Sequence, residues 1–216
     1  MIAAIAVLGS LILVAINPTE TLRKSRDAQR IADLESLSSA IQTYISDYPT
    51  PILYGDNSDN CFSTVTVDAI IGYSFDHAYN NCNYNIGEGA DVTTGSAFGP
   101  QFCFFNSTPE NVDSTGWVPI DFTVLPGGAP LKLLPVDPIN NIQTIDAPSS
   151  SDYVYRYACQ GADVASGFRA NIFELDAVLE SKEYVSKMTG DDGDNLNYFE
   201  TGTSTKLMPS GSNTNF

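Results

Sequence analysis

The sequence predicts an α+β fold, in which one long N-terminal α-helix packs on a C-terminal antiparallel β-sheet domain. Residues 1–16 carry no charged side chain. Residues 19–49 continue with helix-favouring residues and with apolar residues at steps of three and four, which is typical of one face of a helix. From residue 50 onward, short β-type runs alternate with Gly, Pro, Asn and Asp. We therefore expect a helix over 1–49, apolar in 1–18 and amphipathic in 19–49, and a globular β-rich head domain over 50–216.

The apolar segment 1–16 would form a helix about 24 Å long at roughly 1.5 Å per residue. A helix that is apolar all round has to be buried, either in lipid or among copies of itself. A membrane span needs about 20 apolar residues, so the segment is a little short for one. A cleaved export signal is the alternative interpretation, although the segment lacks the basic start that such signals carry.

The amphipathic segment has clear boundaries. Asn17 or Thr19 can cap its start, Pro18 is tolerated in its first turn, and Tyr48 precedes a proline that disfavours further helix. The apolar stripe that we expect to face the head domain consists of Leu22, Ala28, Ile31, Leu34, Leu37, Ile41, Tyr44, Ile45 and Tyr48. Four basic residues cluster here, and we expect them on a solvated face, with a basic collar against lipid or acidic neighbours as the alternative: Arg23, Lys24, Arg26 and Arg30.

The segment AVLGSLILVAINPTETLRKSRDAQRIADLESLSSAIQTYISDYP, residues 6–49, resembles the N-terminal helix of bacterial type IV pilins and of type II secretion pseudopilins. In that family an apolar helix continues into R-D-A-Q-R-x-A-D-L and an amphipathic half that ends at Tyr-Pro. A second stretch, GWVPIDFTVLPGGAPLKLLPVDPINN followed by YVYRYAC and FELDAVLESKEY, is similar to the globular half of pilin-like proteins. Family members carry a basic leader and a glutamate early in the apolar segment. Residues 1–16 contain neither, so Met1 aligns part of the way into the family's helix.

The resemblance implies a structural subunit of an extracellular filament, a type IV pilus that serves adhesion, motility or surface contact. Identical subunits would form a helical homo-oligomer, after each chain has been held in the inner membrane. The residues expected to make the filament core are Ile5, Leu8, Gly9, Leu11, Leu13 and Pro18. A type II secretion pseudopilin and a membrane-anchored, monomeric adhesion or binding protein are the alternatives.

Charge and motifs exclude other classes of function. The net charge is −16, which argues against nucleic-acid binding because phosphate contacts need clustered Lys and Arg. The sequence has no Gly-x-Ser-x-Gly motif, no Walker loop and no His-Glu-x-x-His motif, and it contains one histidine, His77. We therefore expect that the protein is not an enzyme.

Four cysteines, none of them in a Cys-x-x-Cys pair, favour disulfides over a zinc site and indicate an oxidising, extracytoplasmic setting. Two disulfides would allow three pairings. A bond between Cys61 and Cys82 would close an Asn- and Gly-rich loop, and four thiols in a cytosolic protein are the alternative. The cysteines are Cys61, Cys82, Cys103 and Cys159.

The acidic run TGDDGDNLNYFETG, residues 189–202, is the stretch with most ligand character. Its oxygen-bearing side chains surround Gly193, and calcium prefers about six to eight oxygen ligands from a flexible loop. The run resembles the calcium loop of major pseudopilins, which makes calcium the candidate cofactor, whereas a solvated acidic turn is the alternative. The candidate ligands are Asp191, Asp192, Asp194, Asn195 and Glu200.

Within the head domain, the pattern predicts strands over 62–67, 117–125, 154–158 and 168–175, and a short helix over 176–187. Residues 76–116 are polar and Gly-rich and are expected to form a long surface excursion pinned by cysteines. Within it, Asn106-Ser107-Thr108 is a sequon that could accept a glycan.

Overall fold

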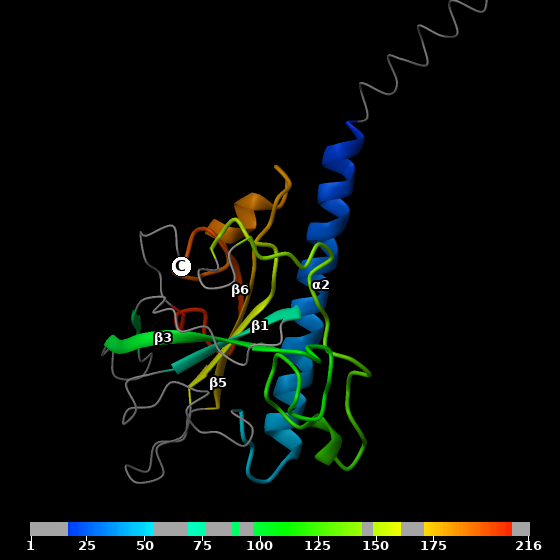
Figure 1. Ribbon diagram of the computed structural model, residues 1–216, viewed down its shortest axis with the longest axis vertical. Coiled ribbons are helices and arrows are strands. Elements are labelled where there is room, and N and C mark those ends of the chain that lie inside the picture. The colour runs from blue at the N-terminus through cyan, green and yellow to red at the C-terminus, as the bar shows by residue number, and fades with distance from the viewer. Residues whose placement is uncertain are drawn as a thin grey trace, which may run out of the picture.

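The computed structural model shows an α+β fold with one long helix packed on an antiparallel sheet (Figure 1), which confirms the predicted fold class. The helix is α2, Pro18–Asp47, and it packs against β5 and β6. The four antiparallel strands are β1 (Ala69–Asp76), β4 (Arg156–Gln160), β5 (Ile172–Ala177) and β6 (Phe199–Gly202). The structure describes residues 17–53, 69–76, 88–90, 97–143, 149–160 and 171–208.

Two further strands extend the sheet to the order β2-β3-β1-β4-β5-β6, namely β2 (Glu88–Ala90) and β3 (Ala97–Asn106). β3 runs parallel to β1, with Ala69 opposite Gln101. The predicted surface excursion over 76–116 is therefore wrong where β3 lies. Gly99 and Pro100 read as turn residues, but the pairing with β1 begins immediately after them, so they do not interrupt it.

The ends of α2 follow from local chemistry. Asn17 adopts a left-handed conformation, and its side-chain oxygen accepts a hydrogen bond from the Glu20 backbone N–H at 3.4 Å. Pro18 occupies the first turn, where its missing N–H costs nothing. Tyr48 is extended at the C-terminal end, as its position before a proline predicts. Among the residues that the structure describes, no helix is long and apolar enough to cross a membrane.

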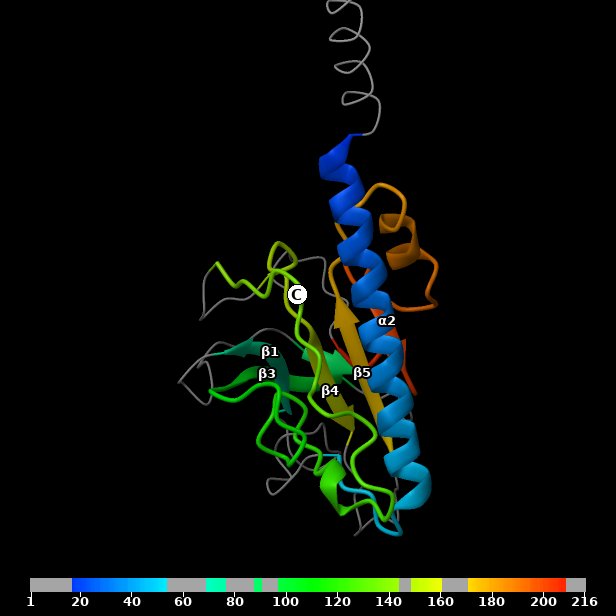
Figure 2. The same ribbon diagram turned by 90° about the vertical axis from the view of Figure 1, so that its right-hand side faces the viewer.

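Figure 2 shows α2 running alongside β5. Leu34, Leu37 and Ile41, in the second half of α2, are fully buried in one core with Phe173 and Leu175 of β5. Each such side chain contributes about 1.5–3 kcal/mol when buried. The predicted stripe is thus confirmed from Ile31 to Tyr44, whose side chains are buried.

The first half of α2 is different, and the predicted stripe is wrong there. Leu22 is 61% exposed and Ala28 is exposed as well. Figure 1 shows the N-terminal turns of α2 extending past the sheet, with the segment around η3 (Val185–Thr189) beside them. Among the described residues of α2, Ile31 is the first buried apolar side chain and packs with Leu179 and Met188, so no apolar core holds the turns before it.

An ionic clamp holds these turns instead, formed by Arg26, Asp27, Arg30, Asp137 and Glu180. Arg30 is fully buried and donates two hydrogen bonds to Asp137, at 2.6 and 3.0 Å. Its third nitrogen donates to Asp27 and to Glu180, at 2.8 Å each. Arg26 donates two hydrogen bonds to Glu180, at 2.6 and 2.7 Å.

Backbone groups complete the ionic clamp. Asp27 accepts the N–H groups of Glu180, at 3.0 and 3.2 Å, and of Ser181 at 2.7 Å. The predicted solvated basic face is therefore wrong for Arg26 and Arg30, because both point at carboxylates of the head domain. Arg23 and Lys24 remain about half exposed.

The core also contains residues outside helices and strands. Trp117, Val118 and Ile120 are fully buried, but the predicted strand over 117–125 is wrong: the segment is irregular and ends in the 3-10 helix η2, Phe122–Val124. The predicted helix over 176–187 is wrong as well, because β5 continues to Ala177 and η3 begins at Val185. In both segments the apolar residues are spaced as in a strand or a helix because they are buried against the sheet and α2. Irregular backbone can bury them equally well.

Replacing Arg30 by Met should destabilise the protein by about 3–5 kcal/mol, because Asp27 and Asp137 would stay buried without their partner. Unfolding can be followed by the fluorescence of Trp117, the single tryptophan, which is fully buried. Lys24→Met is the matched control, since the exposed pair of Lys24 with Glu183 should contribute little. Equal losses of stability in the two variants would contradict the ionic clamp.

Candidate functional site

The two faces of the sheet differ in chemistry. The face toward α2 is apolar and carries Tyr157, Phe173 and Leu175. On the opposite face, the four neighbouring strands β1, β4, β5 and β6 each contribute one side chain, and each of these residues is paired with the next across the sheet. This polar row consists of Tyr73, Arg156, Asp176 and Glu200.

The polar row is buried although it bears charges. Arg156 forms an ion pair with Asp176, and its guanidinium lies 3.4 Å from the centre of the Tyr198 ring. Tyr73, Arg156, Asp176 and Glu200 are each at most 2% exposed. Buried ionised groups are costly unless they are paired, so this row needs compensation.

Two members of the row, Asp176 and Glu200, form a carboxylate cluster with Glu174. Each offers one oxygen, and these three oxygens lie within 4.8 Å of one another. Glu174 accepts the backbone N–H groups of Leu207 at 2.5 Å and of Met208 at 2.7 Å. These bonds fasten the segment after β6 over the polar face of the sheet.

The environment of the cluster disfavours negative charge. Burial, followed by the charge of Asp176, raises the pKa of Glu174 well above its usual range. Burial raises the pKa of Asp176 to about 6, although Arg156 opposes the shift. Burial and the charge of Asp176 raise the pKa of Glu200 to about 8. The cluster can therefore take up protons or hold a cation, which are the two ways to neutralise it.

The predicted calcium loop lies against this cluster, and its residues have different roles. The Asp191 carboxylate accepts the N–H of Gly193 at 3.1 Å and that of Glu200 at 2.8 Å, so it ties the loop to β6. Asp192 is exposed, with a positive φ of 65°. Asp194 is half-buried, and burial raises its pKa.

Asn195 and Glu200 complete the predicted set. The Asn195 N–H donates to the Glu200 carboxylate at 3.0 Å, and the Asn195 side chain accepts the N–H of Asn197. Gly193 is required by close approach, because a Cβ there would lie 1.9 Å from a Glu200 oxygen. Of the five predicted ligands, only Glu200 belongs to the carboxylate cluster. The loop as a calcium site stays a prediction.

Glu174 and Asp176 were not among the residues predicted from the sequence. In FELDA the two acids alternate with Leu175, which is the pattern of a strand with one face in solvent. The acids lie instead under the segment that follows β6, and residues 207 and 208 are far away in the sequence. The available signal was that FELDA, residues 173–177, lies shortly before the acidic run of residues 189–202.

Of the predicted cysteines, Cys159 is buried in β4 and is disulfide-bonded. The backbone of Cys103 lies in β3, and Cys61 and Cys82 lie outside the described residues. The pairing of the four stays a prediction.

Of the six predicted assembly residues, the structure describes Pro18. Pro18 is the first residue of α2. The remaining five fall outside the described residues: Ile5, Leu8, Gly9, Leu11 and Leu13.

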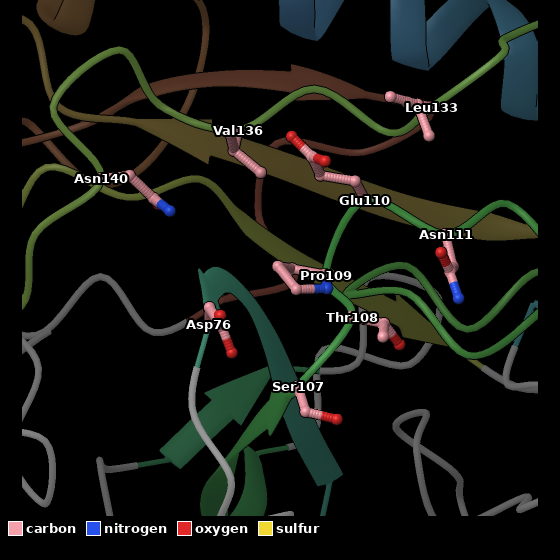
Figure 3. Close-up of a pocket in the computed structure, with 9 residues that line it drawn as sticks. All are labelled: Asp76, Ser107, Thr108, Pro109, Glu110, Asn111, Leu133, Val136 and Asn140. Atoms are coloured by element: carbon pink, nitrogen blue, oxygen red, sulfur yellow. The ribbon is translucent and has the colours of Figure 1, made fainter.

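A surface pocket of about 390 Å³ lies beyond the ends of β1 and β3 (Figure 3). Its lining mixes polar and apolar side chains, and the carboxylates of Asp76 and Glu110 lie apart from each other in Figure 3. Ser107 and Thr108 of the sequon line it as well. The pocket therefore offers no convergent set of reactive groups.

In the presence of a chelator, the melting temperature should fall as the pH rises from about 6 to about 8.5. Glu200 has a pKa of about 8 in the folded protein and an ordinary value when unfolded. The folded state thus binds more protons, and that stabilisation is lost as the pH rises through 8. Glu200→Gln should reduce the slope and raise the melting temperature at high pH.

Asp192→Asn is the control for this titration, since Asp192 is exposed and asparagine accepts its left-handed backbone. In Asp192→Asn the melting temperature should fall with pH as steeply as in the wild type. A wild-type melting temperature that rises from about pH 6 to about 8.5 would contradict the raised pKa of Glu200.

The chain matches no protein-family model, no curated protein and no solved structure. The α+β architecture of a helix on an antiparallel sheet is therefore established from the chain's own structure, which is consistent with a pilin-like fold.

Proposed function

We propose that the protein is a structural subunit of an extracellular filament of the type IV pilus kind, assembled through its N-terminal helix. The observation that carries the proposal is the construction of α2. Its second half is part of the head-domain core, whereas its first turns extend past the sheet with Leu22 61% exposed. The chain before α2 is the uncharged, apolar segment 1–16.

Such a construction needs a partner for its apolar end. A helix that is apolar all round has to be covered, and copies of the same segment are a cover that every subunit supplies. Burying one face of it would contribute on the order of 10 kcal/mol per subunit before entropy costs, at about 25 cal/mol per Å². Head-to-tail contacts that do not close a ring then generate a helical filament.

The disulfide of Cys159 and the net charge support this proposal. The disulfide at Cys159 is typical of proteins outside the reducing cytoplasm. Before assembly the apolar segment would hold the subunit in the inner membrane, and after assembly the head domains would form the cell-surface side of the filament. The net charge of −16 makes a nucleic-acid partner unfavourable, and no catalytic motif in the sequence supports an enzymatic role.

A type II secretion pseudopilin is the second candidate. It is favoured by the acidic loop of residues 191–195, which lies against the carboxylate cluster and resembles the calcium loop of that group. A pseudopilin would form short assemblies that do not extend as surface fibres. A membrane-anchored monomer is the third candidate.

Material sheared from producing cells should contain thin filaments in negative-stain electron microscopy, and mass spectrometry of that fraction should find this chain. A chain that stays in the membrane fraction without filaments would favour the pseudopilin. A chain that also stays monomeric in detergent would favour the anchored protein.

Leu11→Asp should abolish filaments while the head domain still folds, because a charge would enter the apolar filament core. Leu196→Asp is the matched control: Leu196 is 65% exposed on the head, and its variant should still assemble. Filaments of normal yield from Leu11→Asp would argue against assembly through the apolar segment. Circular dichroism of both variants separates loss of assembly from loss of folding.

A further inference from the structure

The carboxylate cluster has too little positive charge around it. It contains Glu174, Asp176 and Glu200, which carry a formal charge of −3 when ionised. Among the described residues, the ion pairs of the cluster come from Arg156 alone, through Asp176. A deficit of two charges remains in a site where all three acids are at most 2% exposed.

The cluster also has unused acceptor atoms. One oxygen on each carboxylate is held by a donor: the backbone of Leu207 and Met208 for Glu174, Arg156 for Asp176, and the backbone of Asn195 for Glu200. The second oxygen of each is buried, and no described residue donates a hydrogen bond to it. The three atoms are Oε1 of Glu174, Oδ1 of Asp176 and Oε1 of Glu200. Buried acceptors of this kind require a ligand, which can be a cation or a shared proton.

We propose that Glu174, Asp176 and Glu200 bind one calcium ion on the polar face of the sheet, between β5 and β6. Two oxygens on opposite sides of a calcium ion are about 4.6–5.2 Å apart, since each lies about 2.3–2.6 Å from the ion. The three oxygens lie within 4.8 Å of one another, so a single ion of this size can contact all of them. Calcium is preferred over magnesium, because magnesium keeps several of its water molecules and the cluster is buried beside Leu207 and Met208.

The donors from outside the cluster are compatible with a bound cation. A carboxylate that accepts backbone N–H groups or faces a guanidinium is stabilised in its ionised form, and each member of the cluster does one or the other. A divalent ion would balance the remaining two charges, so the acids could stay ionised despite their burial.

This site differs from the predicted calcium loop. It shares Glu200 with the loop, and its two other ligands come from β5. Asp191 acts as a positioning residue, because its carboxylate holds the N–H of Glu200 at 2.8 Å. Asp192 is exposed on the loop and takes no part.

The test uses the full chain, purified in detergent and stripped of metal with a chelator. Calcium chloride should raise the melting temperature seen by Trp117 fluorescence, because a ligand of the folded state stabilises it. Titration calorimetry should show one calcium per chain, and magnesium should bind more weakly. The measurement is independent of filament formation, so its failure leaves the proposed function untouched.

Glu174→Gln and Glu200→Gln keep the shape and one acceptor oxygen of each side chain but remove its charge. Each should weaken calcium binding by at least about tenfold, since ligand charge sets affinity. Both variants should melt no lower than the wild type without metal, which shows that they fold. Asp192→Asn is the control and should bind calcium as the wild type does.

Three results would overturn the proposal. The first is a melting temperature that calcium leaves unchanged while acidification raises it, which would mean that shared protons neutralise the cluster. The second is a calcium response that Asp192→Asn abolishes, which would place the ion in the loop. The third is a response that survives both glutamine substitutions.

Discussion

The placement of α2 on the head domain depends on Arg30. The helix has an apolar face only from Ile31 onward, so hydrophobic packing fixes its second half and leaves the first half without a core. Arg30 joins that first half to Asp137 and Glu180 by hydrogen bonds of 2.6–3.0 Å. A bidentate guanidinium contact is directional as well as attractive, which apolar packing is not. The angle at which the N-terminal turns leave the head therefore follows from charged groups.

The ionic clamp and the carboxylate cluster, both buried in the described part of the chain, are compensated to different degrees. In the ionic clamp two guanidinium groups face three carboxylates, and backbone N–H groups of residues 180 and 181 add to the positive side. In the carboxylate cluster one guanidinium faces three carboxylates, and burial raises the pKa of every acid. The charges of the clamp are thus paired within the chain, whereas each acid of the cluster keeps a buried oxygen without a hydrogen-bond partner among the described residues. This difference is the reason why we propose a bound ion at the cluster and none at the clamp.

The sequence predicted the parts of the fold that local chemistry determines. Helical periodicity, Pro18 and the Tyr48-Pro49 step set the helix, and alternation located β4 and most of β5. The sequence could not predict contacts between distant segments. Arg30 looked like a solvated charge because its partner Asp137 is 107 positions away, and Glu174 looked exposed because the cover comes from Leu207 and Met208. Among the five calcium ligands predicted in the acidic loop, only Glu200 belongs to the carboxylate cluster.

The polar row has a consequence for how the strands find their register. A shift of β5 by one residue against β4 would place Leu175 across from Arg156 and turn Asp176 toward the apolar core under α2. The shift would bury a charged carboxylate on the apolar face of the sheet and would leave the guanidinium of Arg156 unpaired on the polar face. A misaligned sheet is therefore destabilised more strongly than it would be by the loss of apolar alternation alone. The polar row thus helps to fix the register of the four strands β1, β4, β5 and β6. In a divergent descendant we expect its four residues to be retained or replaced as a set.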